Sequence, residues 1–273
     1  MKRILLLATL LSSLYARSAD VDTVSIASAA MGRSLKCVVI RPDAYARGTD
    51  SFATVYLLHG LTGRYDNWVQ KARSLKEYVD RYNVVVVCPD GAFNSWYLDS
   101  PEDPKHRFET YIAQEVPAFI ESRYRVRRAR GQRAITGLSM GGHGGLYLGL
   151  RHSRFFGAAG GMSGAYAIEN ITEKQYGVSR LLGDTASKAR YRAHSIFGEL
   201  EKPRTDTLAL ILDCGVDDFI VDMSRAAHKR LLELKIAHDY TERPGKHDWP
   251  YWNNAVQYQL LFFRNYFDRN ASR

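Results

Sequence analysis

The sequence predicts an α/β fold in which a mostly parallel, doubly wound sheet carries helices on both faces. Short apolar runs alternate along the chain with longer segments of helical periodicity. The run 84–87 consists of four valines, which is typical of a strand buried on both faces of a parallel sheet. A Gly-x-Ser-x-Gly pentapeptide, 137–141, stands between a strand-like run and a helix-like run. Together these observations favour a doubly wound sheet over an all-helical or all-β fold.

The expected strands are short and apolar, and they occupy the runs 36–41, 53–58, 84–88, 133–137, 155–160, 208–213 and 237–242. Between them, the segment 112–120 places apolar residues on one helical face, and Pro117 predicts a kink within it. The run 223–234 is amphipathic and is predicted to be a helix. The chain has 273 residues, 45% of them hydrophobic, and shows no linker or repeat, so we expect a single domain over residues 20–273.

The first residues have a different character. Lys2 and Arg3 precede the apolar stretch 4–11, and small and polar residues follow as far as Ala19. This is the pattern of a secretory signal peptide, and it is too short for a membrane span. We therefore predict a signal peptide over residues 1–19, a periplasmic or secreted protein, and no stable membrane insertion.

Ser139 is the predicted nucleophile. A serine on a tight strand-to-helix turn adopts a strained backbone conformation, and Gly137 and Gly141 remove the Cβ atoms that would clash there. The hydroxyl is then exposed at the edge of the sheet, beside the first N–H groups of the following helix. A serine hydroxyl is a poor nucleophile until a base takes its proton, and a carboxylate must orient that base. In this type of fold we expect the carboxylate and then a histidine to follow Ser139 in the chain.

Three carboxylates follow the apolar run 208–212 and could orient the base: Asp213, Asp217 and Asp218. We favour Asp218 over Asp217, although spacing alone does not separate two adjacent acids, and Asp213 is the third candidate. One of these acids is expected to serve as a turn residue or a helix N-cap instead. The predicted base is His247, which lies on a loop after the strand-like run 237–241.

An oxyanion hole requires two backbone N–H groups near the nucleophile. One is predicted to belong to Met140, directly after Ser139. The other is predicted to belong to Leu61, because an apolar strand ends there in the sequence His59-Gly60-Leu61.

The chain resembles the esterase D-like group of α/β-hydrolases, which includes S-formylglutathione hydrolases, tributyrin and acetyl esterases, feruloyl esterase domains and the mycolyltransferase antigens. The resemblance covers about residues 24–267 and rests on five ordered motifs: L-L-H-G-L-T-G, C-P-D-G-x-x-N-S-W-Y, G-L-S-M-G-G-H-G, C-G-x-D-D-F and G-x-H-D-W. It implies an α/β-hydrolase fold, a triad of Ser139, Asp218 and His247, and the same two oxyanion donors. It supports Asp218 in particular, because the acid of the family stands three residues after the glycine that matches Gly215.

Several aromatic residues are predicted to flank the reaction site. Trp96, Trp249 and Trp68 are the leading candidates for substrate contacts, and Tyr97, Tyr251 and Trp252 lie near them in sequence. Flat apolar walls suit sugars and phenolic acyl groups, although at least half of these rings are expected to pack in the core.

We therefore expect an exported serine carboxylic-ester hydrolase that forms an acyl-enzyme on small-molecule or oligosaccharide esters, with short-acyl or carbohydrate-linked acetyl or feruloyl groups. Two alternatives use the same residues: an acyltransferase to a sugar hydroxyl, and a thioesterase similar to S-formylglutathione hydrolase, which export disfavours because that substrate is intracellular. A non-catalytic binding module is the third, and the intact set of triad candidates argues against it.

No cofactor and no metal are expected, because this chemistry needs neither and no metal-binding motif occurs in the sequence. The three cysteines, Cys37, Cys88 and Cys214, lie in or beside apolar strands and are predicted to be buried and unpaired. The net charge is +9, and the densest basic cluster, 123–130, has no nucleic-acid motif around it, so we expect no nucleic-acid partner. No feature of the sequence points to a particular oligomeric state.

Overall fold

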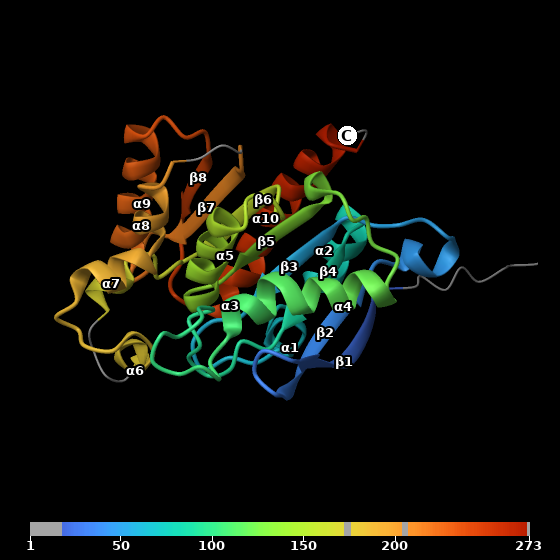
Figure 1. Ribbon diagram of the computed structural model, residues 1–273. Coiled ribbons are helices and arrows are strands. Elements are labelled where there is room, and N and C mark those ends of the chain that lie inside the picture. The colour runs from blue at the N-terminus through green and yellow to red at the C-terminus, as the bar shows by residue number, and fades with distance from the viewer. Residues whose placement is uncertain (1–17, 172–175, 204–206, 272–273) are drawn as a thin grey trace, which may run out of the picture.

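The computed structural model describes residues 18–171, 176–203 and 207–271 (Figure 1). The predicted signal peptide, residues 1–19, lies outside this part of the chain except for its last two residues. Among the described residues, no helix has both the length and the apolar character that a membrane span requires.

The described residues form one eight-stranded sheet in the order β1-β2-β4-β3-β5-β6-β7-β8 (Figure 1). The strands β1 and β2 pair antiparallel, as do β2 and β4, and all other neighbours are parallel. The strand bounds are β1 Asp20–Ser28, β2 Arg33–Arg41, β3 Thr54–Leu58, β4 Val85–Pro89, β5 Arg133–Gly137, β6 Ala158–Met162, β7 Ala209–Gly215 and β8 Asp239–Arg243.

All seven predicted strands are present, and among the strands of the described residues β1 alone was not predicted. This edge strand pairs along its whole length with β2. Its apolar residues are separated by acidic and small polar side chains, so it lacks the continuous apolar run from which the other strands were predicted. The strand predicted at 155–160 begins later, at Ala158, because Phe155 and Phe156 belong to the preceding turn, where their N–H groups donate to the carbonyl of His152.

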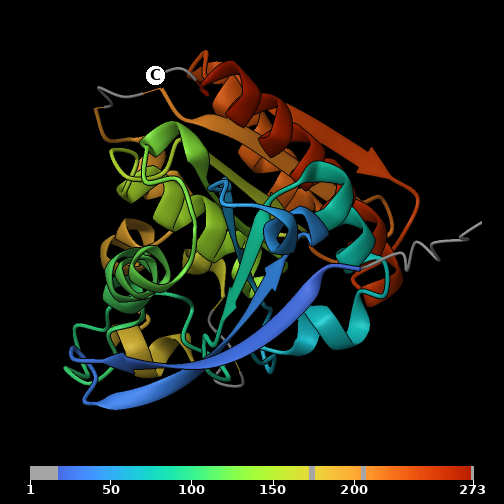
Figure 2. The ribbon, with the colours of Figure 1, turned by 90° about the vertical axis from the view of Figure 1, so that its right-hand side faces the viewer.

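Helices cover both faces of the sheet (Figure 2). Residues of β3 and β4 alternate between the two cores: Tyr56 and Val87 face the side covered by α4, α5 and α9, whereas Val55 and Val86 face α2 and α10. The helix bounds are α1 Asn67–Lys71, α2 Leu75–Tyr82, α3 Phe108–Thr110, α4 Val116–Arg123, α5 Met140–Arg151, α6 Val178–Leu182, α7 Lys188–Ala193, α8 Ile196–Leu200, α9 Val221–Glu233 and α10 Trp249–Arg269.

The segment predicted to kink at Pro117 contains a π-helical turn at Tyr111–Glu115, directly before α4. Proline provides no N–H for the preceding turn, so it stands at the first positions of a regular helix, and the irregular turn comes before it.

The order of the strands places the site. Within the sheet, β4 lies next to β3 on one side, and β5 lies next to β3 on the other side. The carboxyl ends of β3 and β5 therefore meet at a switch point, which is where ligands bind in open parallel sheets.

Candidate active site

Ser139 occupies a strained turn between β5 and α5. Its φ and ψ are 55° and −117°, values that a non-glycine residue rarely adopts. The two glycines of the pentapeptide are packed against backbone: a Cβ on Gly137 would lie 2.5 Å from the carbonyl oxygen of Gly141, and one on Gly141 would lie 2.5 Å from that of His59. The predicted steric reason for both glycines is therefore confirmed.

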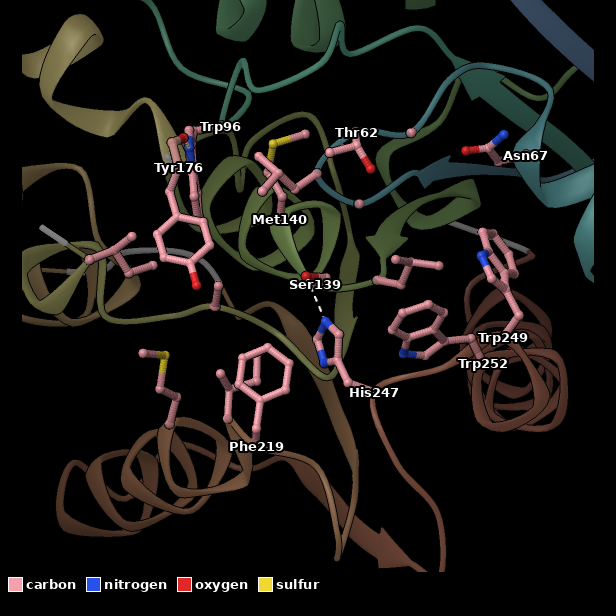
Figure 3. Close-up of a pocket in the computed structure, with 18 of the residues that line it drawn as sticks. Thr62, Asn67, Trp96, Ser139, Met140, Tyr176, Phe219, His247, Trp249 and Trp252 are labelled. Carbon is pink, nitrogen blue, oxygen red and sulfur yellow. Dashed lines mark hydrogen bonds between the residues drawn. The ribbon is translucent and has the colours of Figure 1, made fainter. Parts of the chain in front are cut away.

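Ser139, His247 and Asp218 form a continuous chain of hydrogen bonds. The Nε2 atom of His247 lies 3.0 Å from the Oγ atom of Ser139, and its Nδ1 atom lies 2.8 Å and 3.0 Å from the two carboxylate oxygens of Asp218. Figure 3 shows the imidazole directed at the serine from the loop that precedes α10. Because Nδ1–H donates to Asp218, Nε2 is left to accept the proton of the serine hydroxyl.

The structure separates the three candidate acids. Asp217 is exposed to solvent. Asp213 is buried at the end of β7, where it accepts hydrogen bonds from Tyr251 and Arg243 and does not contact the histidine. Asp218 is 3% exposed and is the acid that holds His247.

The carboxylate of Asp218 is held in its ionised form. Burial acts to raise its pKa, but the hydrogen bond with His247 and the N–H of Ile220, at 3.0 Å, outweigh burial, so the pKa lies below its ordinary value. A charged acid beside Nδ1 is what an imidazole needs in order to accept a proton at Nε2.

Ser163 and Trp252 lie behind Asp218 and His247, and Ser163 was not among the predicted site residues. Ser163 is fully buried at a φ of 47°, and its Oγ atom accepts the indole N–H of Trp252 at 3.1 Å. A hydrogen bond from Ser163 also helps to lower the pKa of Asp218. The ring of Trp252 packs edge-on against His247, with centroids 4.9 Å apart. No local motif distinguishes a serine of this kind.

Leu61 and Met140 both line the cavity beside Ser139. Amides next to them are already engaged: Thr62 donates to the carbonyl of Phe93 at 2.7 Å, and Gly141 donates to that of Leu138 at 2.7 Å. The two residues predicted to supply the oxyanion hole therefore lie beside Ser139, next to amides that already have an acceptor.

His59 fixes the loop that carries Leu61. Its Nδ1–H donates to the carbonyl of Gly60 at 2.8 Å, and its Nε2 accepts the N–H of Gly91 at 2.8 Å. Burial lowers the pKa of this imidazole, so it remains neutral and holds both loops together. Gly60 allows close approach, because a Cβ there would lie 2.6 Å from the Cδ1 atom of Leu138.

A cavity of about 560 Å³ opens over Ser139 (Figure 3). Trp96 and Trp249 line it, as do Trp252 and Tyr176. Trp96 has a φ of 53°, and its indole N–H donates to the carbonyl of Tyr176 at 2.9 Å.

The prediction that Trp68 lines the cavity is wrong. Trp68 is fully buried, its indole N–H donates to the carbonyl of Leu58 at 3.0 Å, and its ring packs edge-on behind Trp249 at 5.3 Å. Tyr97 and Tyr251 are also core residues: Tyr97 donates to the carbonyl of His59, and Tyr251 donates to Asp213. Three wall residues were missed. Tyr176 and Ile171 come from segments without a recognisable motif, whereas Phe219 ends the motif C-G-x-D-D-F and was not predicted to line the cavity.

Within the described part of the chain, no group of three or more His, Cys, Asp or Glu side chains is placed to hold a metal ion. Cys37, Cys88 and Cys214 are buried and unpaired, as predicted from their positions in apolar strands.

Comparison with known proteins identifies the family. The model of the Esterase family matches residues 28–263. An acetyl esterase of Caldicellulosiruptor saccharolyticus is 32% identical over 233 residues, covering 80% of this chain and 86% of that protein. The diacylglycerol acyltransferase/mycolyltransferase Ag85A of Mycobacterium gordonae is 25% identical over 278 residues, covering 87% and 78% of the two chains.

Solved structures have the same architecture. A ferulic acid esterase superposes with a TM-score of 0.79 at 27% identity, covering 91% of this chain and 98% of its own. An S-formylglutathione hydrolase from Staphylococcus aureus shares the fold with a TM-score of 0.77 at 20% identity, covering 90% and 99%. The chain therefore belongs to the Esterase family, has the α/β-hydrolase fold and is a carboxylic-ester hydrolase.

Proposed function

We propose that this protein is an exported serine esterase that uses Ser139, His247 and Asp218 as a catalytic triad. The observation that carries the proposal is the unbroken chain of hydrogen bonds from Asp218 through His247 to a strained serine in a cavity. Such an arrangement activates a hydroxyl that would otherwise be a poor nucleophile.

The reaction follows from the positions of these groups. Oγ of Ser139 attacks the ester carbonyl carbon while Nε2 of His247 takes its proton, and the N–H groups of Leu61 and Met140 stabilise the oxyanion by about 3 kcal/mol each. When the tetrahedral intermediate collapses, the C–O bond to the alcohol breaks and His247 returns the proton to the leaving oxygen. A water molecule, deprotonated by His247, then attacks the acyl-enzyme and releases the acid, and Ser139 regains its proton.

We propose short-acyl or carbohydrate-linked esters, acetyl or feruloyl, as substrates. The volume of about 560 Å³ suits a small acyl group with part of a sugar. The flat rings of Trp96, Trp249 and Trp252 suit sugar faces or a phenolic ring. The similarity to an acetyl esterase and to a ferulic acid esterase supports the same substrate classes.

The test compares 4-nitrophenyl esters of increasing chain length with acetylated and feruloylated oligosaccharides, each with and without a free sugar acceptor. We expect faster cleavage of short than of long acyl chains, with release of free acid. The Ser139→Ala variant should fold normally and lose about 10⁴- to 10⁶-fold in kcat. Substantial activity in this variant would contradict the proposed nucleophile, and acceptor-dependent product without free acid would establish a transferase instead.

Export is proposed on the leader sequence, in which Lys2 and Arg3 precede an apolar stretch. N-terminal sequencing of protein recovered from the cell envelope and medium tests it, because removal of about the first 19 residues is expected. An uncleaved chain found only in the cytosol would contradict export without affecting the triad.

A further inference from the structure

The cavity has two chemically different walls beside the base. In Figure 3, Trp249 and Trp252 lie on one side of His247, and Phe219 lies on the other. Phe219 is continued by Ile220 and Met223, so that wall is apolar. The wall of Trp249 and Trp252 is continued by Asn67 and Lys71 of α1, which supply hydrogen-bonding groups.

The alcohol part of an ester must lie within reach of His247, because this residue protonates the leaving oxygen. A run of side-chain contacts leads from His247 along the polar wall. The ring of Trp252 is 4.9 Å from that of His247, the ring of Trp249 is 5.5 Å from that of Trp252, and Nζ of Lys71 is 5.4 Å from the centroid of Trp249. A sugar that extends from the reacting oxygen along this wall meets flat rings first and then an ammonium group.

The charge of the cavity has one sign. Among the described residues that line it, Lys71 is the single lysine or arginine, and no aspartate or glutamate is present. The ammonium of Lys71 lies over the ring of Trp249, and this cation–π contact places the positive charge beside the polar wall. The positive charge of Lys71 favours an anionic group on a bound sugar, and the lining contains no carboxylate that would repel this group.

The basic cluster at 123–130 does not offer a competing anion site of the same kind. Arg125 donates to the carbonyls of Tyr45 and Asp50. Arg127 donates to that of Ser51, and Arg130 donates to that of Ser153. These guanidinium groups tie loops together, whereas Lys71 faces the reaction cavity.

We propose that Asn67, Lys71 and Trp249 form a subsite for a sugar that carries a carboxylate, so that the preferred substrates are short-acyl esters on uronic-acid glycans. The inference rests on the proposed function and adds that the alcohol part of the ester carries a negative charge. The sugar stacks on Trp249, Asn67 hydrogen-bonds a hydroxyl group, and the carboxylate pairs with the ammonium of Lys71.

The test uses two acetylated disaccharides that differ only at C6, one built from galacturonate and the other from galactose. At low ionic strength the wild type should cleave the galacturonate ester with a kcat/KM roughly three- to fivefold higher, the size expected of one solvent-exposed ion pair. The difference between the two esters should appear in KM rather than in kcat, and it should shrink as salt is added. Lys71→Met, which keeps an unbranched side chain of similar length and removes the charge, should bring the ratio of the two kcat/KM values close to one, and Lys71→Arg should keep the preference of the wild type.

Lys229→Met is the matched control. Lys229 is an exposed lysine of α9 that does not line the cavity, so this variant has the same net charge as Lys71→Met and should keep the wild-type preference. Equal kcat/KM values for the two esters in the wild type, or a preference that survives in Lys71→Met, would overturn the subsite. If the wild type cleaves neither disaccharide nor 4-nitrophenyl acetate, the proposed function fails, and the subsite fails with it.

Discussion

Two regions of the molecule contain a buried carboxylate that holds a histidine. At the cavity, Asp218 lies 2.8 Å from Nδ1 of His247. At the far end of α5, Glu109 lies 2.9 Å from Nε2 of His152. Judged by burial and by this distance alone, the two pairs are equivalent, since Asp218 is 3% and Glu109 is 9% exposed.

Their remaining partners differ. The second nitrogen of His247 lies 3.0 Å from the hydroxyl of Ser139, beside the cavity that we propose as the substrate site. Glu109 instead accepts a further hydrogen bond from Arg151 at 2.8 Å, and Arg151 continues to Glu199. A carboxylate that orients a histidine is thus only a positioning device. The hydroxyl on the other nitrogen and access for substrate determine whether the pair supports chemistry or stability.

Among variants that keep Ser139, the largest expected effect comes from Asp218→Asn. The asparagine amide can donate to Nδ1 and so favours the tautomer that cannot accept the proton of Ser139, and kcat should fall by about 10⁴-fold. The melting temperature should change by only a few degrees, because the shape of the side chain is kept. Steady-state kinetics on 4-nitrophenyl acetate and thermal unfolding measure both. A loss of less than tenfold in kcat would show that the two pairs do not differ as described.

Glu109→Gln should have the opposite profile, with a loss of stability and unchanged kcat per folded molecule. Burial acts to raise the pKa of Glu109, but hydrogen bonds from His152 and Arg151 outweigh it and lower the pKa from 4.5 to about 2. Because the folded-state pKa is depressed, the stabilisation is complete above about pH 4.5 and is lost as the pH falls towards 2. It amounts to about 3 kcal/mol at neutral pH.

Urea unfolding at pH 7 and near pH 3 tests this prediction. The variant should be less stable than the wild type at pH 7, and the difference should narrow at the lower pH. A difference in unfolding free energy that stays constant with pH would contradict the paired, ionised state of Glu109. A fall in kcat comparable to that of Asp218→Asn would remove the distinction between the two regions.

Local sequence made the reaction edge predictable. Gly137 and Gly141 are needed because backbone atoms approach them within van der Waals distance, and this requirement leaves a readable motif around Ser139. The strand of four valines and the His59-Gly60-Leu61 turn are likewise set by short-range constraints. Chain order placed His247 and the three candidate acids close to the ends of strands β8 and β7. The choice of Asp218 among these acids came from the family resemblance, because spacing did not separate it from Asp217.

The walls of the cavity were not predictable in the same way. Trp68 and Trp249 have the same residue type, but one packs behind the other, and only the tertiary structure determines which ring faces the cavity. Tyr176 reaches the wall because its carbonyl accepts the indole N–H of Trp96 from a distant part of the chain. Contacts of this kind depend on how loops fold over the sheet, and they leave no periodicity in the sequence.

Of the variants that alter the two carboxylate–histidine pairs or their supports, Ser163→Ala should change kcat less than Asp218→Asn does, because Ser163 only supports the pair at the cavity. The hydroxyl of Ser163 helps to lower the pKa of Asp218, and it accepts the indole N–H of Trp252, whose ring packs against His247. Ser163→Ala removes this hydroxyl from the surroundings of the carboxylate and one acceptor from the indole, and we expect kcat to fall about tenfold with little change in KM. Since Ser163 has a φ of 47°, Ser163→Gly removes the same hydroxyl without backbone strain. Equal losses of kcat in the two variants would assign the effect to the hydroxyl, whereas wild-type kcat in Ser163→Gly would show that the carboxylate needs no support beyond His247 and the N–H of Ile220.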